Sequence, residues 1–200
     1  VDFVPLGCEP SAAGDYAMAA PIRDRGPLPP RVDLRAGLPP VGDQGRQNSC
    51  VAWAVGYYYK SFQEAREQWW SLSSPEHQFS PTYIYNQRPT SDCRSDRGMT
   101  IAAAMQIVQR GIAPLSLVPY NSRDTCVKPD AATLARASEY RSASFAMVFQ
   151  GAGRANIEQI KALLASGTPV VIAIPVYNNF KAASPGKAII GEPPPRSCLL

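Results

Sequence analysis

The sequence predicts an α+β fold with segregated lobes, because helical patterns dominate its first half and strand patterns appear in its second half. Its 200 residues suffice for one domain with a sizeable core, or for two small lobes around a cleft. Hydrophobic residues make up 45% of the chain and charged residues 18%, which is typical of a globular protein rather than a disordered one.

The first 32 residues differ in character from the rest of the chain. They contain little apolar periodicity and six prolines: Pro5, Pro10, Pro21, Pro27, Pro29 and Pro30. Proline blocks helices and weakens strands, so we predict an extended or irregular arm over residues 1–32. A folded domain over residues 33–200 is expected to follow.

Three helices are predicted. The first begins at Ser49, which is an acceptable N-cap, and runs to about Trp69 or Trp70. Its core-facing residues recur at helical spacing: Val51, Val55, Tyr58, Phe62 and Ala65. The second runs from Thr100 to Arg110 and stops at Gly111. The third runs from about Ile157 to Ser166, with Asn156 as its cap and Gly167 as its end.

Two strands are predicted in the second half. Phe145, Met147 and Phe149 alternate with small or polar neighbours, which indicates a half-buried strand. The segment from Pro169 to Tyr177 is apolar and rich in β-branched residues, which indicates a central strand.

Charge and hydropathy exclude two classes of partner. The formal net charge is +4, but the basic residues are scattered and no nucleic-acid motif is present, so we expect no nucleic-acid role. No apolar run approaches the roughly 20 residues of a membrane-spanning helix. No metal or cofactor is predicted.

The cysteine count bears on location. The five cysteines are Cys8, Cys50, Cys93, Cys126 and Cys198. If Cys50 is a free thiol, four remain for two bridges, which fits an exported protein, periplasmic or secreted, or one in a lysosome-like compartment. The alternative is a cytosolic protein with five thiols. The chain begins with Val1, which we interpret as the removal of something upstream, and no signal-peptide pattern remains.

Cys50 has the surroundings of a nucleophile. A thiol attacks a carbonyl only as thiolate, and a helix N-terminus such as the one predicted here favours negative charge. The oxyanion formed by attack needs aimed donors, which the amide of Cys50 and the side chain of Gln44 could supply. Gly45 permits the turn that brings Gln44 back. Without further support, a lone cysteine at a helix start is more often a small core residue.

Several segments resemble landmarks of papain-family cysteine peptidases, in order, over roughly residues 33–180. These segments are Asp33-Leu34-Arg35, Val41-Gly42-Asp43-Gln44-Gly45, Asn48-Ser49-Cys50, Phe79-Ser80-Pro81-Thr82-Tyr83-Ile84-Tyr85, Gly98, Gly111-Ile112, Pro119-Tyr120 and Pro169-Val170-Val171-Ile172-Ala173-Ile174. The proline-rich start is similar to that of bacterial, xylellain-like members.

The resemblance implies a papain-like two-lobe fold, with a helical lobe around the Cys50 helix and a β-rich lobe. It implies a cysteine endopeptidase that needs no cofactor and acts on peptide or protein substrates. The implied roles are nucleophile for Cys50, oxyanion donor for Gln44, backbone binding of substrate for Gly98, a specificity pocket for Met99, Thr100 and Ala173, and a disulfide for Cys93 and Cys126. Core packing is an equal alternative for the three pocket residues.

The sequence also departs from the family pattern. Gln47 replaces a family cysteine, and Val51 replaces the usual aromatic residue after the nucleophile. The catalytic His and Asn are expected about 130–150 residues after the nucleophile, but the single histidine is His77. His77 is expected to be a surface or loop histidine. To explain the missing catalytic His and Asn, we favour a truncated piece or a frameshifted C-terminus over a natural pseudoenzyme.

Two functions therefore compete. The first is a papain-like endopeptidase acting through Cys50, with residues 1–32 either as an inhibitory arm or as a disordered leader. The second is a non-catalytic protein that keeps the cleft and grips extended peptides near Gly98.

Overall fold

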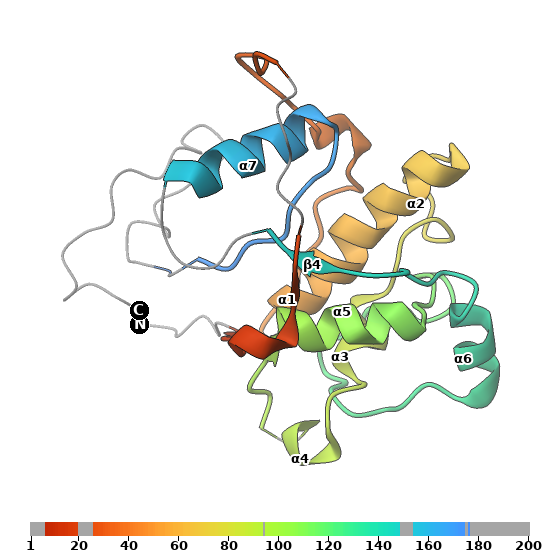
Figure 1. The fold of residues 1–200 in the computed structure, drawn as a ribbon. Helices are drawn as coiled ribbons and strands as arrows, with labels where there is room; N and C mark the ends of the chain where they lie inside the picture. The colour runs from red at the N-terminus through yellow and green to blue at the C-terminus, as the bar shows by residue number, and fades with distance from the viewer. Residues whose placement is uncertain (1–6, 20–25, 94, 149–153, 175, 177–200) are drawn as a thin grey trace.

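The computed structural model describes residues 7–19, 26–93, 95–148, 154–174 and 176 (Figure 1). Its α-helices are α1 (Cys50–Ala52), α2 (Ser61–Gln68), α3 (Pro81–Tyr85), α4 (Thr90–Cys93), α5 (Ile101–Arg110), α6 (Ala131–Ala137) and α7 (Arg154–Ala165). A π-helix, η3 (Trp53–Lys60), joins α1 to α2, and the two 3₁₀ turns are η1 (Ala13–Asp15) and η2 (Arg35–Gly37). The strands are β1 (Cys8–Glu9), β2 (Ala17–Met18), β3 (Met99–Thr100) and β4 (Ala146–Met147).

The helices α1, η3 and α2 form one unbroken rod, which confirms the predicted first helix. The rod ends at Trp69, whose backbone is left-handed with φ 58°. Val55 and Phe62 are buried as predicted, but Tyr58 is only partly buried while Tyr57 is buried beside it. The π-helix holds more residues in each turn than an α-helix, so it shifts the phase of the buried face.

A buried ion pair lies where the π-helix joins α2. The Lys60 ammonium contacts the Glu64 carboxylate at 2.6 Å, and both side chains are more than 90% buried. Lys60 also donates to the backbone carbonyl of Arg141 at 3.3 Å. Charges removed from water remain ionised only when they are paired and hydrogen-bonded in this way.

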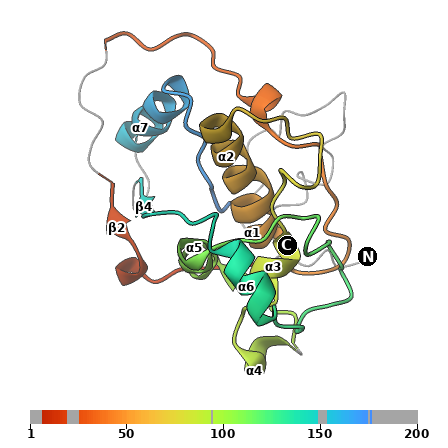
Figure 2. The ribbon, with the colours of Figure 1, turned by 90° about the vertical axis from the view of Figure 1, so that its right-hand side faces the viewer.

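The core lies between the rod, α3 and α5, which adjoin one another in both views (Figure 2). The second predicted helix is confirmed as α5, because the Thr100 hydroxyl accepts from the Ala103 amide at 3.0 Å and Gly111 ends the helix. Sequence analysis did not predict α3. Its start has a clear cap, since the Ser80 hydroxyl accepts from the Tyr83 amide at 3.1 Å.

Both strand pairs join the N-terminal arm to the folded domain. Strand β1 pairs in parallel with β3, and β2 pairs in parallel with β4. Strand β4 is shorter than the strand predicted around residues 145–149, and residue 149 lies outside the described residues. The arm therefore crosses the domain at two places and is held by backbone hydrogen bonds at each.

The predicted central strand at Pro169–Tyr177 is wrong for the residues that the structure describes in it, 169–174 and 176. This segment has no strand partner there, and Ile172 and Ile174 are 60% and 53% exposed. Intrinsic β-propensity does not make a strand without a neighbouring backbone to bond.

The third predicted helix is present as α7, but it begins at Arg154, so Asn156 lies inside the helix rather than at its cap. The predicted end is confirmed, because Gly167 follows the helix with φ +80° and its amide donates to the Leu164 carbonyl at 2.9 Å. The predicted cap at Asn156 is therefore wrong, and the predicted end at Gly167 is confirmed. The described residues contain no helix that is both long and apolar enough to cross a membrane.

The predicted disulfide between Cys93 and Cys126 is not formed, because Cys126 is a free, exposed thiol. The carboxylate of Asp124 accepts from the amides of Cys126 and Val127 at 3.1 and 3.0 Å. This local turn fixes the backbone at Cys126 and leaves its side chain toward solvent.

Candidate active site

Cys50 is the first residue of α1 and is partly buried. Burial raises the pKa of the Cys50 thiol, while hydrogen bonds from the backbone N–H groups of Gly7, Val51 and Cys50 itself act in the opposite direction. Two of these donors belong to the helix N-terminus, where amides lack helical partners. The third belongs to the arm. The sulfur therefore lies in a small nest of amides, but its net environment favours the neutral thiol.

Gln44 lies beside Cys50, as the sequence predicts. Both residues line an open cavity of about 310 Å³, together with Gly42, Asp43, Trp53, Ala54 and Tyr58. Gly45 has φ +59°, and its amide donates to the Asp43 carboxylate at 2.8 Å, which forms the predicted turn. The side-chain amide of Gln44 donates to the Gln47 carbonyl at 3.0 Å. This hydrogen bond must break before the Gln44 side-chain amide can donate to an oxyanion.

Tyr120 holds this loop together, although sequence analysis used it only as a family landmark. Its hydroxyl lies 2.8 Å from the Gln44 carbonyl oxygen and 3.1 Å from Gln47 Oε1, both of which can accept its single proton. It also shares a 2.9 Å hydrogen bond with the Ser49 hydroxyl. Ser49 therefore contacts Tyr120 and makes no side-chain capping bond to α1. The contact joins residues more than 70 positions apart, so no local pattern could have indicated it.

Asp96 ties the nucleophile loop to the segment that carries Gly98. The amide of Asn48 donates to the two carboxylate oxygens of Asp96 at 3.3 and 3.2 Å. The Tyr85 hydroxyl donates to the same carboxylate. Burial, followed by this hydrogen bond, raises the pKa of Tyr85 well above its usual range. The result is a fixed spacing between Cys50 and the Gly98 edge.

The arm occupies the Gly98 edge. The Met99 amide donates to the Gly7 carbonyl at 3.0 Å, and Cys8 and Glu9 lie opposite Met99 and Thr100. Gly98 has φ +97°, and a Cβ placed on it would lie 2.6 Å from the Cα of Gly7. Only glycine allows so close an approach of two backbones at this φ. The edge predicted to bind extended peptide thus binds an extended segment of this chain.

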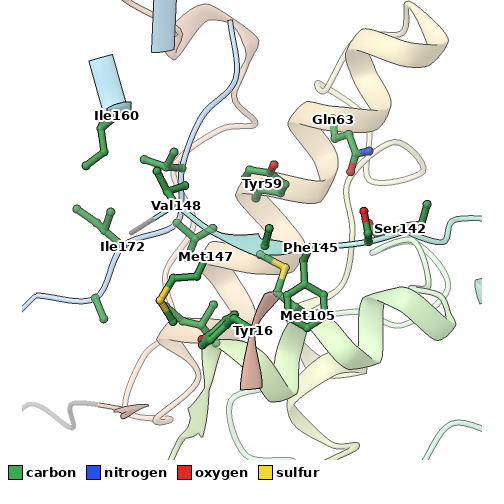
Figure 3. A pocket seen from close by; sticks show the side chains of 17 residues that line it. Tyr16, Tyr59, Gln63, Met105, Ser142, Phe145, Met147, Val148, Ile160 and Ile172 are labelled. Atoms are coloured by element: carbon green, nitrogen blue, oxygen red, sulfur yellow. The ribbon is translucent and has the colours of Figure 1, made fainter. Parts of the chain in front are cut away.

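The three predicted pocket residues are not gathered at one place. Met99 is 3% exposed and belongs to the core, and Thr100 caps α5. Ala173 lines a second cavity, of about 560 Å³, between the rod, α5, α7 and β4 (Figure 3). Figure 3 shows Tyr16 of the arm, Met105 of α5 and Ile160 of α7 around this space. The specificity role of the three residues stays a prediction.

His77 lies at the other end of the rod from Cys50. Its ring stacks on Trp70 with a centroid distance of 4.4 Å, and Nδ1 donates to the Ser71 carbonyl at 2.8 Å. The rod from Cys50 to Gln68 is roughly 27 Å long at about 1.5 Å per residue. The only histidine of the chain therefore cannot reach the Cys50 thiol.

No group of three or more His, Cys, Asp or Glu side chains arranged to hold a metal ion occurs among the residues that the structure describes. The site is therefore described by its thiol, amides and carbonyls alone.

Comparison with solved structures gives the fold a precedent. The chain is similar to the crystal structure of xylellain, a cysteine protease from Xylella fastidiosa, with a TM-score of 0.64 and 24% sequence identity. The match covers 84% of this chain and 66% of xylellain, so the chain spans just under two thirds of that protein's length. A structure of digestive procathepsin L 3 from Tenebrio molitor larval midgut also matches, with a TM-score of 0.48, 21% identity, and coverage of 65% of this chain and 40% of that one.

No protein-family model and no curated protein matches the sequence. The likeness to xylellain confirms the papain-like α+β fold that the sequence predicts, with the cysteine at the start of its helical part. At this level of identity the likeness concerns the fold, and function must be argued from the site.

Proposed function

We propose that this chain carries the nucleophile side of a cysteine endopeptidase. The observation that carries the proposal is the placement of Cys50 at a helix N-terminus with Gln44 in the same open cavity. In the reaction, the Cys50 thiolate attacks a peptide carbonyl and the C–N bond breaks, which leaves a thioester on Cys50 and releases the amine with a proton. Water then hydrolyses the thioester and regenerates the thiol.

Two groups of the site serve the oxyanion. The Cys50 amide already points toward the sulfur, and the Gln44 side chain needs only to exchange its bond to the Gln47 carbonyl for one to the oxyanion. Tyr120 holds the Gln44 backbone during that exchange. Donors fixed in advance in this way stabilise charge as it develops.

The proposed reaction requires a base that Cys50 does not have in this structure. Burial raises the pKa of the thiol, and the only histidine of the sequence stacks on Trp70 at the far end of the rod. A base that the described residues do not supply must therefore reach the cavity of Gln44 and Cys50 before peptide hydrolysis can occur.

We propose residues 1–32 as an arm and residues 33–200 as the peptidase domain. The arm supports an inhibitory role because Gly7 and Cys8 lie on the edge where Gly98 would pair with a substrate. A substrate peptide and the arm cannot occupy this edge together. Peptides and proteins in extended conformation are the substrates that such an edge would accept.

The same edge favours a second candidate, a protein that binds extended peptides without cleaving them. The observation behind it is that the β3 backbone already pairs with an extended segment, while none of the described residues acts as a base on Cys50. Titration of Cys50 alkylation separates the two candidates. The titration uses the protein purified from its native host. A Cys50 pKa well below that of a free thiol supports the peptidase, and a Cys50 pKa at or above that value supports the binder.

The peptidase proposal is tested with Cys50→Ala in the protein produced in its native host, with Cys126→Ala as the matched control. Cys126 is an exposed free thiol outside the site, so its variant should keep wild-type hydrolysis of a casein substrate. Cys50→Ala should lose hydrolysis and retain its thermal unfolding midpoint. Wild-type hydrolysis by Cys50→Ala would refute the assignment.

We also propose export to an oxidising compartment, on the cysteine count. The free thiols at Cys8 and Cys126 weaken the disulfide part of that argument. Localisation of the tagged protein by cell fractionation tests it, and recovery in the reducing cytosol alone would reject it.

A further inference from the structure

The arm brings a second cysteine to the nucleophile. Cys8 and Cys50 are both free thiols in this structure. They are 42 positions apart in the sequence. Cys8 belongs to the arm and Cys50 to the rod. Cys8 is held in β1 opposite Met99, and Cys50 begins α1.

Contacts on either side of the two cysteines place them close together. Gly7 packs so tightly on Asn48 that a Cβ on Gly7 would overlap the Asn48 carbonyl oxygen and lie 2.8 Å from the Asn48 Cα. Cys8 is one Cα step from Gly7 and Cys50 is two from Asn48, each step being about 3.8 Å. The N–H of Gly7 also donates toward the Cys50 sulfur.

Electrostatics agree with this placement. After burial, the charge of the Cys50 thiolate is the largest influence that raises the pKa of Cys8. Like charges raise each other's pKa in this way only at short range. Cys126, by contrast, lies in the turn that the Asp124 carboxylate stabilises.

We propose that Cys8 and Cys50 are a redox pair, which a small-molecule disulfide of the glutathione type converts to a disulfide bond. The bond would lock the arm on the Gly98 edge and remove the nucleophile. This consequence rests on the proposed function, whereas bond formation requires only the two thiols. The arm would then block the site in two ways, by its position and by a disulfide bond that reduction can break.

The chemistry balances in two exchanges. The Cys8 thiolate attacks one sulfur of glutathione disulfide, the S–S bond breaks, and one glutathione leaves as thiolate and takes up a proton. The Cys50 thiolate then attacks the Cys8 sulfur and displaces the second glutathione. Two protein thiols are oxidised and one glutathione disulfide is reduced to two glutathione molecules. A bridge requires Cα atoms within about 4.4–6.8 Å, so bond formation must bring the two cysteines to that separation.

The test is peptide mapping without reduction after the 200-residue protein equilibrates with glutathione disulfide. We expect a peptide joining Cys8 to Cys50 in the wild type and in Cys126→Ser, which removes another exposed thiol. Cys8→Ser should instead carry glutathione on Cys50. Gly7→Ala, which displaces the arm and keeps both thiols in the chain, should lower the yield of the joined peptide at least fivefold.

Mixed disulfides with glutathione on both Cys8 and Cys50, without a joined peptide, would overturn the proposal. So would pairing of Cys8 with any other cysteine, or an equal yield in Gly7→Ala. Since mapping needs no catalysis, these outcomes do not depend on whether the protein hydrolyses peptides. Conversely, loss of the peptidase assignment would leave a positive map intact.

Discussion

Gly7→Ala is the sharpest test of how the arm controls Cys50. The added Cβ would overlap the Asn48 carbonyl oxygen and lie 2.8 Å from the Asn48 Cα, both of which are backbone atoms that cannot turn aside. The arm must therefore leave the Gly98 edge. It would lose the bond from the Met99 amide to the Gly7 carbonyl, 3.0 Å in the wild type.

The magnitude follows from what holds this part of the arm. A net backbone hydrogen bond contributes about 0.5–1.5 kcal/mol, so the bonds of a two-residue strand hold the arm by about 1–2 kcal/mol. That free energy corresponds to a factor of about 5–30 in the population with the arm displaced. If displacement exposes Cys50, its alkylation rate should rise by the same factor.

The assay is the rate of iodoacetamide labelling of Cys50, followed by mass spectrometry of its peptide. Gly14→Ala is the matched control, because Gly14 lies in the same arm and a Cβ there would meet no atom within 4 Å. Labelling of Cys126 reports general exposure. Equal Cys50 rates in wild type, Gly7→Ala and Gly14→Ala would refute the conclusion that the arm covers the nucleophile.

Lys60→Ala should destabilise the protein by about 3–5 kcal/mol in urea unfolding, because Glu64 would keep a buried charge without its partner; a loss below 1 kcal/mol would contradict the buried pair. Ser80→Ala should cost about 1 kcal/mol by removing the cap on the Tyr83 amide, and an unchanged urea midpoint would show that the cap contributes nothing. Because burial raises the pKa of Cys50, its alkylation in the 200-residue chain alone should reach half-maximum above the value near 8.5 of a free cysteine, whereas a base brought to the site would lower that value. An alkylation midpoint at or below about pH 8.5 would disprove this shift. The raised pKa of Cys50 also contributes stability that is fully present below about pH 8.5 and is lost as the pH rises through the folded pKa.

Much of the helical part could be predicted because its determinants are local. Thr100 and Gly111 bracket α5 within one turn of its ends, and apolar spacing located the rod that begins at Cys50. The pairing of Gln44 with Cys50 also follows from a short loop whose turn depends on Gly45. Capping and turn contacts join residues at most a few positions apart, so they leave a pattern in the sequence.

The errors concern features that need a distant partner. The apolar segment at residues 169–174 has the composition of a strand, but no described neighbour pairs with it. Cys126 was matched to a family disulfide, but its thiol is free and exposed. The π-helix also moved Tyr57 into the core, since periodicity arguments assume an uninterrupted α-helix.

The sequence by itself determined the helix that presents Cys50, the loop that brings Gln44 to it, and the lack of a second histidine. Only the tertiary structure decided that the arm lies over the site in parallel with β3, that Tyr120 and Asp96 hold the nucleophile loop, and that Cys8 lies beside Cys50. Helices and turns form from neighbours along the chain. Pairing between residues 8 and 99 depends on which backbone reaches a free edge, and no local pattern records that choice.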